Sequence, residues 1–176
     1  MSALTGIRIV ELAESVAGEY CGKLLADFGA EVIKVEGPGG SPTRAMAPII
    51  GADGRPECSA VFAYLNTNKR SIELDTGEAE PLHQLIATAD AVIGELSVSE
   101  LAGRHPGVGF CSVTPYGVGA PPELRNAKSL NIFQSSGWGI HTPSHAGPGE
   151  PPLKGPGRFQ AAYEAGLDAA LCVAGS

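Results

Sequence analysis

Four cysteines and four histidines are the side chains in this sequence best suited to metal binding or nucleophilic catalysis. The cysteines are scattered along the chain, at Cys21, Cys58, Cys111 and Cys172. Because they form no Cys-x-x-Cys pair, they are predicted to be reduced and mostly buried thiols. His141 and His145 lie four residues apart, but the surrounding stretch IHTPSHAGPG predicts a loop instead of a helix. The sequence therefore predicts no metal site.

Motifs for serine catalysis and for dinucleotide binding are missing as well. The chain has no Gly-x-Ser-x-Gly motif, and no G-x-G-x-x-G follows its first predicted strand. The stretch EGPGGSP after the second predicted strand is not a Walker A motif. These observations disfavour a serine hydrolase and a nicotinamide-dependent enzyme.

The composition is typical of a soluble globular protein, with 43% hydrophobic and 18% charged residues among 176. A formal net charge of -7 disfavours nucleic acid as a partner. A single phosphate-bearing ligand needs only a few local cations or helix N-terminal amides, so it fits this charge. No secretory signal and no membrane-spanning apolar run is found, which predicts a cytoplasmic protein without a membrane partner.

Strand-like and helix-like segments alternate along the chain. The residue patterns predict strands at 6–12, 30–36, 71–75, 91–96 and 109–117. They predict helices at 13–29, 78–89, 97–104, 129–139 and 160–175. Such alternation is typical of the α/β class, and we expect a Rossmann-like open, mostly parallel sheet with helices on both faces.

Three stretches of the chain are distinctive. They are LTGIRIVELAESVAGEYCGKLLADFGAEVIKVEGPGGSPTR (4–44), YLNTNKRSIELD (64–75) and CSVTPYGVGAPPEL (111–124). They resemble three regions of the family III CoA-transferases, the group that contains formyl-CoA transferase, carnitine CoA-transferase and α-methylacyl-CoA racemase. The resemblance covers nearly the whole chain but only the first half of a typical member. It implies CoA or acyl-CoA as the ligand, and transfer of CoA between carboxylic acids as the activity.

The same resemblance implies a set of CoA-binding residues, which are Val16, Ala17, Arg44, Leu65, Asn66, Lys69 and Arg70. Cations in the matching loops suit the phosphates of CoA, and amides at the start of a helix suit them as well. Lys69 and Arg70 have an alternative interpretation as solvated charges beside a strand. One region departs from the family, because GELSVSELAG (94–103) stands where members carry an Asn-Phe-Arg-Pro-Gly-like stretch.

The resemblance places the family's catalytic aspartate at or beside Ala162. In members that aspartate attacks the acyl-CoA thioester and forms a mixed anhydride, which a methyl group cannot do. Glu164 or Asp168 could substitute from the same helix, although both fit solvated helix charges better. No aspartate lies between residues 150 and 167, so a shifted alignment recovers none. The remaining interpretation, a non-catalytic protein that binds CoA esters or serves as a subunit, is favoured.

We expect residues 1–176 to form one domain, which corresponds to the N-terminal half of the large domain of a family III member. The second, smaller domain through which members interlock as dimers is not expected in this sequence. An exposed apolar face should result, which predicts association with a second copy or with a full-length family III partner subunit.

Overall fold

The protein is described from a computed structural model, which defines residues 2–51, 57–74, 79–95, 98–141, 149, 155 and 157–176. Five parallel strands form the main sheet, in the order β5-β2-β1-β6-β7. Their bounds are β1 Arg8–Glu11, β2 Glu31–Glu36, β5 Arg70–Glu73, β6 Ala91–Gly94 and β7 Gly109–Ser112. In register, Val10 of β1 pairs with Ile33 of β2 on one side and with Val92 of β6 on the other. The predicted α/β fold with a parallel sheet is confirmed.

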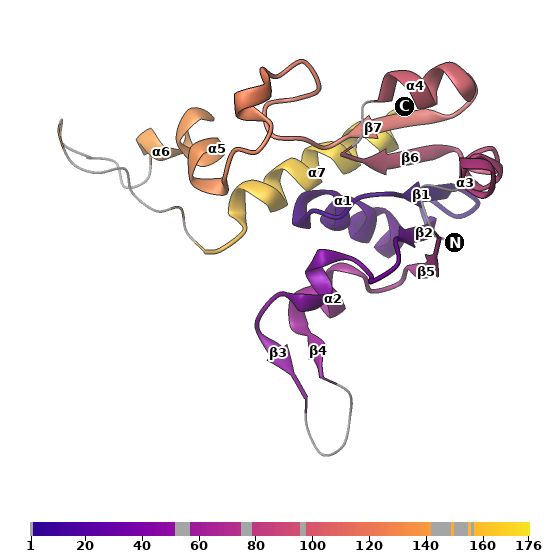
Figure 1. Ribbon diagram of the computed structural model, residues 1–176, viewed down its shortest axis with the longest axis horizontal. Coiled ribbons are helices and arrows are strands. Elements are labelled where there is room, and N and C mark those ends of the chain that lie inside the picture. The colour runs from indigo at the N-terminus through magenta and orange to yellow at the C-terminus, as the bar shows by residue number, and fades with distance from the viewer. Residues whose placement is uncertain are drawn as a thin grey trace.

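Helices cover both faces of this sheet (Figure 1). On one face lie α1 (Val16–Asp27) and α7 (Gln160–Ala174), whose side chains join Ile9, Val32 and Ile93 in one apolar cluster. On the other face, α3 (Ala79–Ile86) contributes to a second cluster around Val10 and Val92. Leu101 of α4 (Val98–Arg104) packs against this second cluster. Alternate residues of the central strands therefore serve the two halves of the core.

Helix α1 begins where its sequence offers a cap. The side chain of Ser15 accepts a hydrogen bond from the backbone N–H of Gly18, which satisfies one of the free donors at the helix start. The helix ends at Asp27, before Gly29 with a φ of 97°, a left-handed conformation that favours glycine. The predicted helix at 13–29 is therefore confirmed as an element but begins three residues later.

Helices α1 and α7 lie side by side and run in the same direction (Figure 1). Gly166 of α7 faces the first turns of α1, and a Cβ there would lie 2.5 Å from the carbonyl oxygen of Ala17. Only a residue without a side chain permits this close approach. Further along both helices, Leu24 of α1 and Leu171 of α7 line one apolar groove.

The connection between β2 and β5 contains short elements that the sequence patterns do not reveal. They are the 3-10 turn η1 (Pro42–Ala45), the antiparallel pair β3 (Ile49–Ile50) and β4 (Cys58–Ser59), and the helix α2 (Ala60–Leu65). The side chain of Ser59 caps α2 by accepting the backbone N–H of Phe62. Between β7 and α7 lie the turn η2 (Pro122–Leu124) and the helices α5 (Ser129–Ser135) and α6 (Trp138–His141).

Candidate functional site

The strand order reverses at β1, because the chain first adds β2 and β5 on one side of it and then β6 and β7 on the other. In open parallel sheets, ligands bind outside the carboxyl ends of the strands at such a reversal. Here the carboxyl end of β1 leads into the N-terminus of α1, and the carboxyl end of β6 leads directly into Glu95. A ligand site is therefore expected at this edge of the sheet.

A cavity of about 520 Å³ lies at this edge. Its walls come from the ends of β6 and β7 and from the segment after β7, through Glu95, Ser112, Thr114, Pro115, Gly117, Val118, Arg125 and Asn126. The Oγ1 atom of Thr114 is buried and has no hydrogen-bond partner within the described part of the chain. Arg125 is exposed. The cavity thus offers a buried hydroxyl, a carboxylate and a cation to a ligand.

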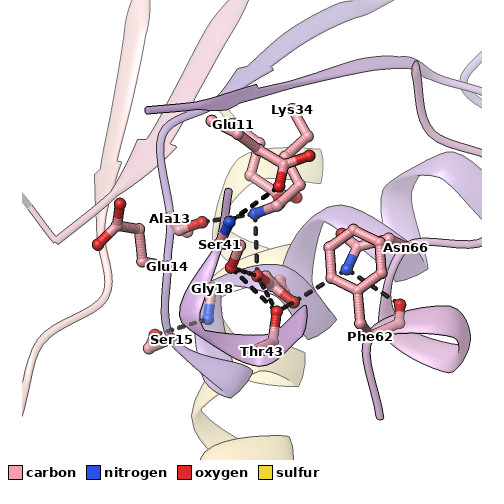
Figure 2. A network of polar contacts seen from close by, with 12 residues as sticks. Glu11, Ala13, Glu14, Ser15, Gly18, Lys34, Ser41, Thr43, Phe62 and Asn66 are labelled. Carbon is pink, nitrogen blue, oxygen red and sulfur yellow. Dashed lines mark hydrogen bonds and ion pairs between the residues drawn. The ribbon is translucent and has the colours of Figure 1, made fainter. Parts of the chain in front are cut away.

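A buried polar cluster lies beside this edge, between β1, β2, α1, η1 and residues 62–69 (Figure 2). At its centre is the fully buried carboxylate of Glu19, in the first turn of α1. The hydroxyls of Ser41 and Thr43 donate to its Oε1 atom at 2.5 and 2.8 Å, and the amide of Asn66 donates to Oε2 at 3.0 Å. Glu19 thereby ties η1 and the end of α2 to α1.

Lys34 is one of two cations in this cluster, with a side chain that is only 1% exposed. Its ammonium lies 2.9 Å from Glu19 Oε1 and 3.2 Å from Glu11 Oε1, and donates to the carbonyl oxygen of Ala13 at 2.8 Å. Burial lowers the pKa of Lys34, but the two carboxylates outweigh burial and raise it above its ordinary value. A lysine within the buried strand β2 is therefore held in its charged form.

Lys69 closes the cluster from the other side of Glu11, and its ammonium contacts three oxygen atoms. It lies 2.7 Å from Glu11 Oε2, and it donates to the backbone oxygen of Glu19 at 2.7 Å and to Asn66 Oδ1 at 3.0 Å. Burial raises the pKa of Glu11 against the opposing pull of Lys69 and Lys34. A Cβ at Gly22 of α1 would overlap the Glu11 carboxylate, so this helix can cover the cluster only with glycine at that position.

Arg44 belongs to a second ion pair at the same edge of the sheet. Its Nε and Nη2 atoms donate to the two carboxylate oxygens of Glu36 at 2.6 and 2.8 Å, while its guanidinium lies 3.8 Å from the centre of the Phe62 ring. The hydrogen bonds from Arg44, with help from Ser71 and the backbone of Ser41, lower the pKa of Glu36 to about 2. The Arg44 side chain is 47% exposed, so one side of it faces solvent.

Five of the residues predicted to bind CoA fall into two groups. Val16 and Ala17 form the first turn of α1, at the reversal of strand order. Asn66 and Lys69 both contact Glu19. Leu65, which is fully buried, is the last residue of α2 and directly precedes Asn66.

Arg44 lies in η1, whose Thr43 donates to Glu19 and so connects this turn to both groups. Arg70 stands apart from them. Arg70 is the first residue of β5, so it lies at the amino end of that strand. Its guanidinium donates to Glu31 at 2.8 Å, and its side chain is 76% exposed. The structure therefore brings six of the seven predicted residues toward one edge and leaves Arg70 at the other end of its strand.

Ala162 is the third residue of α7, one helical turn before Gly166. Residues four apart share a helix face, so Ala162 lies on the face that meets α1, near the start of that helix. Glu164 lies two positions further along, which places it on another face of α7, and its carboxylate accepts a hydrogen bond from Gln160 at 2.9 Å. Asp168 is exposed. The first turn of α7 therefore presents a methyl group toward α1.

Aromatic rings surround the first turns of α7. The Tyr163 ring lies 4.8 Å from that of Tyr20, 6.5 Å from that of Tyr64 and 6.1 Å from that of Phe159, in edge-to-face contacts. Burial raises the pKa of Tyr163. These rings fix the start of α7 against α1 and α2.

Several residues of this edge were missed by sequence reasoning. Glu95, Thr114 and Arg125 line the cavity, and Glu19 and Lys34 form the centre of the buried cluster. A signal for Lys34 exists, because a lysine inside the apolar run EVIKVE requires a buried partner or an exposed edge. No local signal identifies Thr114, whose position depends on the pairing of β6 with β7.

The predictions on metal binding and membrane spans can be compared with the described residues alone. Among them, no group of three or more histidine, cysteine or acidic side chains is arranged to hold a metal ion. His145 lies outside the described residues, and His141 ends α6. In the portion of the chain that the structure defines, no helix has both the length and the apolar character needed to span a bilayer.

Known proteins resemble this chain in sequence over most of its length. A succinate–glutarate CoA-transferase from Agrobacterium fabrum is 39% identical over 134 residues, which are 67% of this chain and 34% of that protein. A probable fatty acyl-CoA transferase from Mycobacterium tuberculosis is 31% identical over 155 residues, or 80% of this chain and 39% of its own length. The chain therefore spans between a third and two fifths of the length of these curated relatives.

Solved structures agree with the sequence comparisons. A CaiB/BaiF family protein from Brucella suis superposes with a TM-score of 0.76 at 31% identity, over 98% of this chain and 48% of that one. The crystal structure of the Mycobacterium tuberculosis protein gives a TM-score of 0.78 at 28% identity, over 98% and 50% of the two chains. The sequence model of CoA-transferase family III matches residues 4–171. This chain belongs to CoA-transferase family III.

Proposed function

We propose that this chain binds CoA or an acyl-CoA thioester at the carboxyl edge of its sheet. The observation that carries the proposal is the cavity of about 520 Å³ beside the N-terminus of α1, at the reversal of strand order. CoA combines phosphates, an adenine and an amide-bearing arm, so its site needs cations, hydroxyl or amide partners and apolar walls. The cavity wall supplies a cation in Arg125, a hydroxyl in Thr114 and an apolar side chain in Val118.

Arg44 is proposed to contact a phosphate of CoA from beside the cavity. A guanidinium carries five N–H donors, and hydrogen bonds to Glu36 engage its Nε and one donor of its Nη2 atom. The remaining donors and the exposed side of the guanidinium support this role. Val16 and Ala17 are proposed to meet the ligand through the first turn of α1.

Lys69 is proposed to act indirectly, although it stands in a matching family signature. Its three ammonium protons already face Glu11, the backbone of Glu19 and Asn66, which leaves no donor for a phosphate. We assign it the positioning of Leu65 and Asn66 against α1. For Arg70, the exposed place at the amino end of β5 supports the alternative role of a surface charge paired with Glu31.

The chemistry of the first turn of α7 favours binding over covalent acyl transfer. Attack on a thioester by this helix requires a carboxylate, and residue 162 is alanine. Glu164 lies on another face and is hydrogen-bonded to Gln160. We therefore propose that the chain holds a CoA thioester without forming an anhydride at position 162.

Calorimetric titration with CoA, acetyl-CoA and succinyl-CoA tests the proposal. Arg44→Ala should weaken CoA binding about 10- to 100-fold, the range expected for loss of charged hydrogen bonds. Thr114→Val, which keeps the shape of the side chain, should weaken it about 3- to 10-fold. Arg104→Ala on α4 removes an exposed cation outside the cavity and should leave the affinity unchanged. Absence of binding by the unmodified chain at millimolar CoA would contradict the proposal.

A second candidate function is a subunit that associates with another copy of this chain. An apolar groove of about 260 Å³ runs between α1 and α7, and its rim exposes Phe28, Leu167 and Leu171 by 59%, 47% and 64%. Among the described residues, no charged side chain lines this groove, which favours contact between two such faces. Light scattering at high micromolar concentration should show a dimer that Leu171→Glu dissociates, and a strictly monomeric protein would contradict this role.

A further inference from the structure

Glu95 occupies the N-terminus of α1 with its own carboxylate. Its Oε2 atom accepts the backbone N–H of Glu14 and its Oε1 atom accepts the backbone N–H of Ser15, each at 3.0 Å. A Cβ added at Gly18 would lie 3.4 Å from Glu95 Oε1, so the carboxylate also lies close to the first turn of the helix. The two N–H groups directly before α1 therefore already bind an anionic side chain, and this negative charge lies where a helix N-terminus favours one.

The same carboxylate forms part of the cavity wall, together with the buried hydroxyl of Thr114. A phosphate placed against this wall would meet a negative charge and would find the N–H groups of Glu14 and Ser15 engaged. A group that carries N–H bonds would instead meet acceptor oxygens, because an ionised carboxylate accepts up to about four hydrogen bonds. The cavity cation, Arg125, is exposed, so an anionic part of a ligand is favoured there and not beside Glu95.

We propose that Glu95 determines which part of the ligand enters this cavity. It selects a neutral, N–H-bearing group for the wall beside α1, and it directs a phosphate toward Arg125, in addition to the one proposed to contact Arg44. Two parts of CoA carry this chemistry, the amides of the pantetheine arm and the amino group of adenine. The inference rests on the proposed CoA binding and adds the orientation of the ligand to it.

The first test compares binding of inorganic pyrophosphate to the unmodified chain, Glu95→Gln and Glu14→Gln. Glutamine keeps one acceptor oxygen for the N–H groups of Glu14 and Ser15 but removes the charge. Glu95→Gln should therefore bind pyrophosphate at least fivefold more tightly. Glu14→Gln removes a neighbouring exposed charge that does not line the cavity, and it should change the affinity less than twofold. Equal pyrophosphate affinities in all three proteins, or equal gains in both variants, would overturn the inference.

Titrations with pantetheine and with adenosine then identify the neutral group. The fragment that occupies the wall should lose at least fivefold in affinity in Glu95→Gln, and the other fragment should not change. If the unmodified chain binds CoA but Glu95→Gln binds pantetheine and adenosine with unchanged affinity, the selection by Glu95 is overturned. If the unmodified chain binds no CoA fragment at all, the proposed function fails, while the pyrophosphate comparison still decides the role of Glu95.

Arg125→Gln gives a second, independent variant in case Glu95→Gln does not fold. Because we place a phosphate at Arg125, this change should weaken CoA at least fivefold and leave pantetheine within twofold. An equal loss for CoA and pantetheine would show that Arg125 does not receive a phosphate, and this result would overturn the proposed orientation.

Discussion

Replacing Lys34 with methionine should strongly destabilise this protein. Methionine has a similar length and shape, so the change removes the charge while it largely keeps the packing. Glu19 would then remain buried, 0% exposed, without the cation that pairs with it, while Glu11, also 0% exposed, would keep the Lys69 ammonium. The backbone oxygen of Ala13 would also lose its donor.

Removal of one partner from a buried ion pair costs about 3–5 kcal/mol, because it leaves an uncompensated charge away from water. Three oxygen atoms lie within 3.2 Å of the Lys34 ammonium, and its side chain is 1% exposed, which favours the upper part of this range. For a domain of this size, about 2–4 °C is lost per kcal/mol, so the midpoint of thermal unfolding should fall by about 6–20 °C.

Urea unfolding followed by circular dichroism measures the loss of stability. An unchanged m-value shows that the variant exposes the same amount of surface on unfolding. Arg8→Met is the control, because the Arg8–Glu31 pair is 40% and 32% exposed and should contribute about 0–1 kcal/mol. Adding Glu19→Gln to Lys34→Met should recover part of the stability, since it removes the charge that Lys34 balanced, whereas Glu11 keeps the Lys69 ammonium at 2.7 Å. A loss below about 1 kcal/mol for Lys34→Met would refute the view that the cluster depends on this cation.

Three further outcomes follow from the same structure. Gly22→Ala should destabilise the fold, because its Cβ would overlap the buried carboxylate beneath α1, whereas Gly103→Ala on exposed α4 meets no atom within 4 Å and should stabilise by up to about 1 kcal/mol in urea unfolding. The ion pair of Glu36 should contribute stability that is complete above pH 4.5 and is lost as the pH falls toward 2, since its folded pKa of about 2 lies below the ordinary 4.5. Urea titrations across this range should show that Arg44→Met loses most of this dependence, and an identical acid response in both proteins would contradict the assignment. Intact-mass spectrometry with acyl-CoA should show no acyl adduct on the unmodified chain and a hydroxylamine-sensitive adduct on Ala162→Asp but not on Ala162→Asn, whereas an adduct on the unmodified chain would contradict the non-covalent role.

The main sheet could be predicted from the sequence, because its strands have strong local patterns. The apolar runs of β1, β2 and β6 stand between helices with a clear three- and four-residue repeat, and alternation of the two predicts parallel pairing. The start of α1 was predicted at residue 13, but the chain reaches its helical conformation only after Ser15, whose side chain caps it. Such a cap shifts a boundary without changing the element.

The short elements between β2 and β5 could not be predicted in the same way. Strands β3 and β4 have two residues each and α2 has six, which is too short for a periodic pattern to stand out. Their positions depend on distant contacts, such as the hydrogen bond from Asn66 to Glu19, which are 47 residues apart.

The candidate site shows the same division between local and distant information. The family signatures directed attention to Arg44 and Lys69, but only the folded chain reveals that the Lys69 ammonium faces Glu11 and that Arg44 keeps an exposed side. Glu95 lies in the stretch 94–103 that departs from the family pattern, but its own role was not predicted, since its bonds to α1 cross 81 and 80 residues of sequence. Charge and residue type were visible in the sequence, but the partner of each charge was not.

A crystal structure of this chain grown with CoA tests the central claim most directly. We predict electron density for the ligand in the cavity beside α1, with a neutral N–H-bearing group toward Glu95 and Thr114 and a phosphate toward Arg125. Density for CoA at another surface, with this cavity unchanged, would contradict the proposed site and its orientation together.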